Sequence, residues 1–169
     1  MTEVTLDYCD QADELAKNPD AKKWIAAAAN GDKAAYDFLW RFWCFAHCYD
    51  DLLDRDNPKP MELGVRELIH FIGMLSFNPF YLKHKDSLFA LLVQACNRWI
   101  DGEEWENSDD PEKRAAAHVV RCGDVEVYTH VAFLTGGWNH MRSLSAIRTY
   151  DKSDDQKPAS LKVVNSKGE

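Results

Sequence analysis

One short acidic run holds the residues best suited to chemistry in this chain of 169 residues. Its sequence is His47-Cys-Tyr-Asp50-Asp51-Leu-Leu-Asp54-Arg-Asp56, and it follows an aromatic run that ends at Phe45. Carboxylates that lie three and four positions apart on a helix project to the same side, and such groups of oxygen ligands bind hard cations like Mg²⁺. The run therefore predicts a divalent-metal site whose primary ligands are Asp50, Asp51 and Asp54.

The helix expected to carry these acids has two apolar faces. At about 100° per residue, four ring-bearing side chains fall on the same side as the three aspartates. These four are Tyr36, Trp40, Trp43 and His47. The opposite side gathers Phe38, Phe42, Phe45 and Tyr49. A helix that is apolar on two faces is typical of an element inside a bundle. We therefore expect the aspartates at the mouth of an aromatic-lined cavity, in which the four ring-bearing side chains bind substrate.

A second interpretation of this helix remains open. In it, the phenylalanine face alone forms the core, and the acids only solvate the end of the helix. Against it stands the position of four aspartates in the C-terminal half of the helix, where the helix dipole already places partial negative charge. A bound cation would relieve that repulsion.

A later helix carries a second polar face. Three oxygen-bearing side chains lie at i, i+4 and i+7, on the side opposite a core stripe that includes Trp99. They are Asn97, Asp101 and Glu104. If this face meets the aspartates, the two together form a clamp for divalent ions, with these three residues as further metal ligands. The alternative is that Gly102 ends the helix and leaves the glutamates after it in a solvated acidic loop.

The segment from Trp43 to Asp56 resembles the first aspartate-rich motif of the class I isoprenoid (terpenoid) synthases, especially squalene and phytoene synthases. In that family the motif lies near the end of a long helix and binds Mg²⁺, which holds the diphosphate of a prenyl substrate above an aromatic-walled cavity. The second metal motif is matched loosely, by Asn97-x-x-x-Asp101 with Glu104 one position short. The chain is shorter than these enzymes and its motifs lie closer together. The resemblance thus implies a reduced terpenoid-synthase-like fold, Mg²⁺ as cofactor, and a diphosphate-containing small molecule as the ligand that is bound or acted on.

Two other functions remain open. The small all-α nucleoside triphosphate pyrophosphohydrolases also use acids on adjacent helices to bind Mg²⁺, although their acids are spaced differently from Asp51-x-x-Asp54 and Asp101-x-x-Glu104. A non-catalytic helical binding or assembly protein would carry the same acids as surface charge. The six tryptophans suit such an interface, or a homo-oligomer, because aromatic residues are enriched in binding hot spots. Whether the protein is an enzyme is left open by its sequence.

Helix start and stop signals predict an all-α bundle of five to six helices in one domain, residues 1–150. Asn30-Gly31-Asp32 supplies a C-cap glycine followed by an N-cap aspartate, and Ser108-Asp109-Asp110-Pro111 starts a later helix. The expected helices span about residues 22–29, 33–55, 61–77, 85–102 or a little beyond, 111–136 and 139–149. Within the third, Val65, Leu68, Ile69 and Ile72 form an apolar stripe, and His70 lies off the stripe, towards solvent. Residues 151–169 have few large apolar side chains and are expected to be a disordered tail.

Composition limits the classes of partner. A net charge of −8 argues against a nucleic-acid-binding surface, which requires a basic patch. No apolar run reaches the length of a membrane span, and the first residues lack the pattern of a signal peptide. The five scattered cysteines suit reduced thiols better than a disulfide framework. We therefore expect a cytoplasmic protein.

Overall fold

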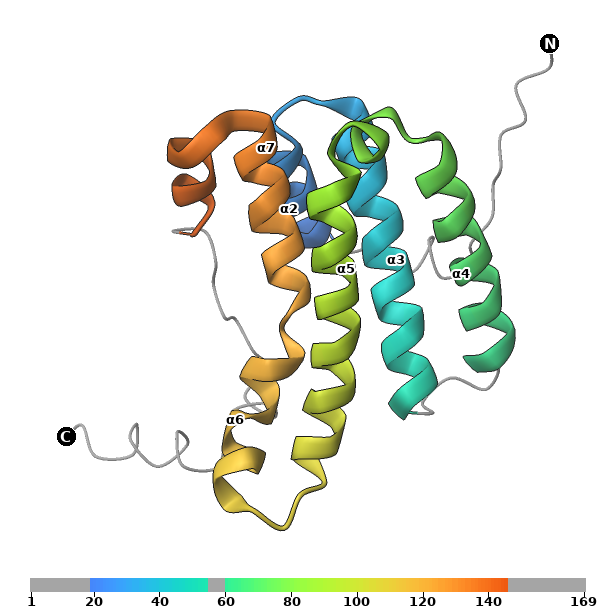
Figure 1. Cartoon of the computed structure of the whole chain (residues 1–169), viewed down its shortest axis with the longest axis vertical. Helices are drawn as coiled ribbons and strands as arrows, with labels where there is room; N and C mark the ends of the chain where they lie inside the picture. Colours follow the sequence, from blue (N-terminus) through green and yellow to red (C-terminus); the bar gives the residue numbers. More distant parts are fainter. Residues whose placement is uncertain (1–18, 55–59, 146–169) are drawn as a thin grey trace.

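The computed structural model describes residues 19–54 and 60–145, which form six α-helices and no strand (Figure 1). The helices are α2 (Pro19–Ala29), α3 (Lys33–Asp54), α4 (Pro60–Phe77), α5 (Pro79–Glu106), α6 (Pro111–Arg121) and α7 (Asp124–Ser145). The predicted all-α bundle is confirmed. None of the described helices is both long and apolar enough to cross a membrane. The predicted tail lies outside the described residues, and the extent of the domain over residues 1–150 stays a prediction.

The central helix, α3, runs beside α5 in the same direction. Their first turns are joined where Asn78 Nδ2 donates a hydrogen bond of 2.8 Å to the carbonyl of Ala34. Near the other end, the ring centroids of Tyr49 and Trp99 lie 5.4 Å apart. α4 connects α3 to α5 and lies at the edge of the bundle against α3 (Figure 1). α2 and α7 pack against each other and against α3, while α6 packs against α5.

Aromatic side chains of α3 build the core. The ring of Phe42 is fully buried, and its centroid lies 6.1 Å from that of Phe71 in α4, 6.0 Å from Trp99 in α5 and 5.9 Å from Tyr128 in α7. Phe45, one turn further along α3, stacks on Phe71 at 5.0 Å. Three helices thus converge on one residue of α3. That the phenylalanine face of α3 lies in the core is confirmed.

The apolar stripe of α4 faces outward, which corrects the sequence prediction. Its four members are exposed: Val65 (47%), Leu68 (42%), Ile69 (62%) and Ile72 (54%). Phe71 packs on α3 instead, and Glu67, which lies one turn before it, is buried. α4 has apolar residues around most of its circumference, and the aromatic partners of Phe71 decide which side meets α3. His70 is partly buried beside Glu67, where solvent was expected.

α5 is longer than its sequence pattern suggested. It begins at Pro79, because Asn78 caps it by accepting a hydrogen bond of 2.8 Å from the amide of Tyr81. The backbone departs from helical geometry at His84 (φ −117°, ψ 15°), next to the predicted start. The helix then continues through Gly102 to Glu106, so Gly102 is not its end.

The helix predicted over residues 111–136 is in fact two helices. α6 and α7 meet at Cys122-Gly123, where the backbone of Gly123 passes so close to α5 that a Cβ would lie 2.9 Å from Cδ of Arg98. The predicted stop at Gly136-Gly137 coincides with a break inside α7, where the backbone leaves helical geometry at Gly137 (ψ −170°), and a further helical piece follows as far as Ser145. The glycine pair bends the helix there, since Gly137 has a φ of 73°.

Candidate functional site

The three aspartates predicted to bind metal lie in the last two turns of α3. Asp50, Asp51 and Asp54 are helical, but their side chains lie outside the part of the chain that the structure describes. Helix register places all three on the side of α3 that carries Trp43 and His47. Their role as Mg²⁺ ligands stays a prediction.

The aromatic row beside them is a continuous contact along α3. The ring centroids of Trp40 and Trp43 lie 5.3 Å apart, and those of Trp43 and His47 lie 4.3 Å apart. His47 Nδ1 is 3.1 Å from the carbonyl oxygen of Trp43, which fixes the imidazole against the helix. Trp43 is nearly buried, Trp40 is half-buried and His47 is exposed. The Nζ of Lys22 in α2 lies 5.9 Å from the ring centroid of Trp40, within the range of a cation–π contact.

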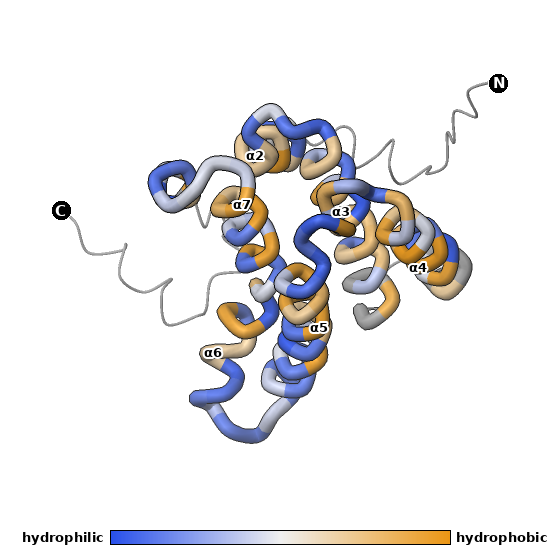
Figure 2. The backbone as a smooth tube through the Cα atoms, turned by 45° about the horizontal axis from the view of Figure 1, so that its top comes forward, coloured by the Kyte–Doolittle hydropathy of each residue, from blue (hydrophilic) through white to orange (hydrophobic). Residues whose placement is uncertain are grey.

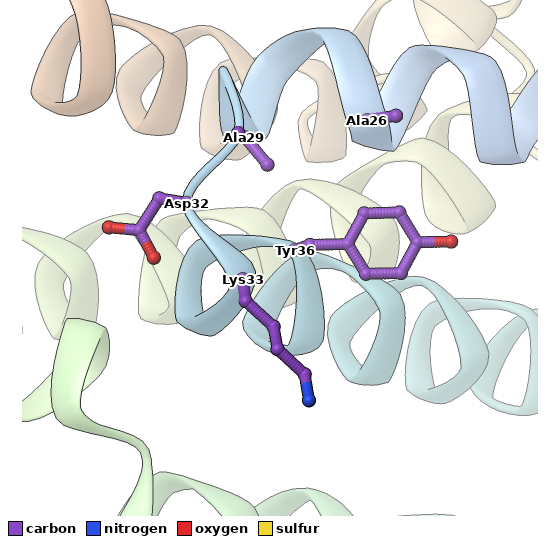
Figure 3. A pocket seen from close by; sticks show the side chains of 6 residues that line it. Ala26, Ala29, Asp32, Lys33 and Tyr36 are labelled. Atoms are coloured by element: carbon purple, nitrogen blue, oxygen red, sulfur yellow. The ribbon is translucent and has the colours of Figure 1, made fainter.

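A cavity of 230 Å³ opens at the far end of this row, beside Tyr36 (Figure 3). Ala26 and Ala29 of α2 line it together with the ring of Tyr36. The carboxylate of Asp32, which also borders the cavity, accepts a hydrogen bond of 3.0 Å from the amide of Ala35. Asp32 is thereby engaged as the N-cap of α3, as predicted. Trp40, Trp43 and His47 are not part of this lining, so the cavity does not join the aspartate end to the expected aromatic wall.

The second polar face points away from α3. Trp99 is the side chain of α5 that packs on α3 at this level, and helix geometry places Asn97, Asp101 and Glu104 about 140–160° around α5 from it. Asn97 Nδ2 donates to Asp101 Oδ2 at 2.7 Å, and Glu104 is exposed. The three residues therefore lie together on one surface of α5, turned away from the helix that carries the aspartates.

The glutamates beside Gly102 belong to a helix–helix contact. Arg121 of α6 donates to the carboxylates of Glu103 at 2.6 Å and Glu106 at 2.7 Å. The predicted solvated acidic loop is therefore wrong for these two residues. The backbone of α6 lies so close to α5 that a Cβ on Gly102 would be 2.9 Å from the Cβ of Arg121.

A second arginine joins α5 to both α6 and α7. Arg98 donates from Nε to the carbonyl of Val120 at 3.2 Å and from Nη2 to that of Val119 at 3.3 Å, which satisfies two carbonyls at the end of α6. Its Nη1 pairs with Glu126 of α7. These contacts position the helices around α5 and leave Glu126 engaged with an arginine.

Glu67 is a buried acid that the sequence patterns did not single out. Its side chain is 1% exposed, with Oε1 3.8 Å from Nε of Arg66 and 3.7 Å from Nδ1 of His70. The available signal was the position of Glu67 four residues before Phe71, which places both on one side of the helix. Among the side chains that the structure describes, which do not include those of Asp50, Asp51 and Asp54, no three of His, Cys, Asp or Glu are arranged to hold a metal ion.

The largest feature missed by the sequence patterns is an exposed apolar surface on α4. We define the α4 apolar face as Met61, Val65, Leu68, Ile69 and Ile72, whose exposed fractions range from 42% to 64%. α5 adds an exposed apolar stripe of its own, made of Phe89, Val93 and Ile100. Hydrophobic residues recur along α4 at the edge of the bundle (Figure 2). The sequence held a signal for this surface, because α4 has apolar residues on more of its circumference than the side that packs on α3.

Comparisons of this chain with protein-family models, with curated proteins and with solved structures gave no match.

Proposed function

We propose that this helical protein is a non-catalytic binding or assembly protein that docks a partner protein on the α4 apolar face. One observation carries the proposal: five large apolar side chains of one helix are 42–64% exposed in the folded chain. Removing apolar surface from water is favourable by about 25 cal/mol per Å², and part of this offsets the cost of association. Folded monomers rarely expose contiguous apolar patches beyond a few hundred Å², and larger ones mark interaction sites.

The charge pattern of α4 supports the same function. Residues 68–77 contain no Asp, Glu, Lys or Arg, although charged residues make up 28% of the whole chain. Interface centres are depleted in charged residues in this way, while the rest of a protein surface is not. The acids and bases of α4 are Glu62, Arg66 and Glu67, and the last of these is buried.

A photoreactive phenylalanine analogue placed at Ile69 tests this function in cells that make the full chain. We expect a covalent adduct heavier than the 19.4 kDa chain from this position. The matched control is the same analogue at Val119 of α6, which is 59% exposed against 62% for Ile69. No adduct from Ile69, or equal adducts from both positions, would refute docking on the α4 apolar face.

A second candidate function is Mg²⁺-dependent binding of a diphosphate-containing small molecule at the end of α3. The contact row of Trp40, Trp43 and His47 favours it, because the row leads along α3 directly to the turns that carry the three aspartates. Mg²⁺ held by carboxylates takes up charge on a diphosphate, which would serve a prenyl-transferase-like or a pyrophosphohydrolase reaction. The candidate rests on α3 alone, since the polar face of α5 is turned away from it.

Thermal melts with Mg²⁺ and pyrophosphate test this second candidate. At a ligand concentration of 100 Kd, binding adds about 2.7 kcal/mol to the free energy of unfolding, which corresponds to about 5–10 °C in Tm for a chain of this size. We expect this shift in the wild type and its loss in Asp51→Asn/Asp54→Asn. The control variant, Asp86→Asn/Asp109→Asn, removes two exposed acids elsewhere and should keep the shift. Identical Tm values with and without ligand in the wild type would exclude the site.

A further inference from the structure

The exposed side of α4 has the spacing of a coiled-coil seam. Met61, Val65, Leu68, Ile72 and Leu75 follow one another at intervals of 4, 3, 4 and 3 residues. In heptad terms Val65 and Ile72 are a positions, and the other three are d positions. β-branched residues at a with leucine at d is the combination that favours two-stranded coiled coils. We call these five residues the α4 seam.

The seam is available for another helix because α4 meets α3 through different residues. Phe71 and Glu67 point into the bundle, and a Cβ on Gly64 would lie 3.7 Å from Cδ2 of Leu52. The first four seam residues are exposed, and only Leu75, at the end nearest Asn78, is partly buried. A heptad seam of this kind accepts the side chains of a second helix between its own.

Charge favours a second copy of the chain over a lipid surface as the occupant. The protein carries a net charge of −8, so two copies repel one another wherever their acids meet. Residues 68–77 carry no acid, so two chains can approach through this part of α4 without opposing carboxylates. A helix that binds an anionic membrane surface is rich in Lys and Arg, whereas α4 has Arg66 as its one such residue.

The seam is also self-complementary. Leu68 stands at its centre, seven residues from Met61 and seven from Leu75. In an antiparallel pair, a two-fold axis perpendicular to the helices at the centre brings Leu68 against the partner's Leu68, and in a parallel pair an axis along the seam does the same. Two-fold dimers are the commonest assemblies of soluble proteins.

We propose that the partner on the α4 apolar face is a second copy of this chain, joined α4 to α4 through the seam with Leu68 at the two-fold axis. This inference rests on the function proposed above and names its partner. The Phe89, Val93 and Ile100 stripe of α5 takes no part in the seam itself.

Sedimentation equilibrium of the purified full chain measures the result directly. The wild type should have twice the 19.4 kDa mass of one chain. Leu68→Glu and Leu68→Lys should each raise the dimer Kd by about a hundredfold or more, because each variant opposes two like charges at the axis. An equimolar mixture of the two variants should recover the dimer, since Glu then faces Lys. Val119→Glu, on α6, should keep the dimer.

Recovery in the mixture also controls for folding, because a chain that fails to fold cannot regain a specific dimer. A wild type that stays at 19.4 kDa up to 100 µM or so would overturn the second copy. So would a dimer that survives both Leu68 variants, or a mixture that stays monomeric. In each of these cases, an Ile69 photoadduct whose mass is not that of two chains leaves the proposed docking function standing. The absence of any adduct refutes both the docking function and the dimer.

Discussion

Phe42→Ala is expected to lower the free energy of unfolding by about 3–5 kcal/mol, the range found when a buried aromatic ring is truncated. The ring is 0% exposed and lies within 6.1 Å of three other rings, in α4, α5 and α7. Its removal leaves a cavity at the point where these helices meet α3, and a rigid core fills such a cavity only in part. Urea denaturation followed by far-UV circular dichroism measures the loss. Since domains are stable by only about 5–15 kcal/mol, the variant should be close to unfolding.

Phe77→Ala is the matched control, because the same side chain is removed where it is 84% exposed. Its effect should stay within about 0.5 kcal/mol, as is usual for surface positions. Similar losses for Phe42→Ala and Phe77→Ala would contradict the convergence of three helices on Phe42.

Gly102→Ala should destabilise the protein by about 1–3 kcal/mol, the cost of inserting a methyl group into a closely packed contact. The new Cβ would lie 2.9 Å from Cβ of Arg121 and 3.1 Å from its Cα and N. These are mostly backbone atoms, so α6 must move away from α5 as a unit. That movement also pulls Arg121 away from Glu103 and Glu106, to which it donates hydrogen bonds.

Gly73→Ala should change the free energy of unfolding in the opposite direction. Gly73 lies inside α4, and a Cβ there would meet nothing within 4 Å. The change should therefore stabilise the protein by up to about 1 kcal/mol, the difference in helix propensity between the two residues. Thermal and urea unfolding of both variants measure the contrast. A stabilised Gly102→Ala would show that α5 and α6 do not approach as closely as described.

Local signals in the sequence predicted most helix limits well. Asn30-Gly31-Asp32 separates α2 from α3 where expected, and Asp110 caps α6 through the amide of Glu112. These limits could be predicted because a cap depends on residues a few positions apart. The start of α5 was predicted next to the kink at His84, whereas the helix already begins at Pro79, capped by Asn78.

Contacts between distant residues were beyond such patterns. Glycine is a residue type that often ends a helix, but Gly102 instead allows α6 to approach α5. That role depends on Arg121, which lies 19 residues further along the chain and on another helix. The apolar stripe of α4 has residues typical of a core, yet it is exposed, and Phe71 makes the contact with α3 instead. Amphipathic spacing identifies the side of a helix that avoids water but not the element that covers it.

The candidate site was predictable to the same extent. The row of Trp40, Trp43 and His47 follows from helix register, and the structure bears this out. Whether Asn97 and Asp101 face α3 depends on how α5 is rotated about its axis. Trp99 sets that rotation by packing against the rings of Phe42 and Tyr49, and it turns the polar face outward.

Asn78 ties three helices of the bundle together. This one buried residue accepts a hydrogen bond from the amide of Tyr81, donates through its side chain to Ala34, and donates from its backbone amide to the carbonyl of Met74. The last turn of α4 and the first turns of α3 and α5 are thereby tied at a single point. Local unfolding that frees this end of α4 must first break the hydrogen bonds of Asn78, which also hold the starts of α3 and α5. The α4 apolar face thus lies on a helix whose last turn cannot loosen without disturbing two neighbouring helices.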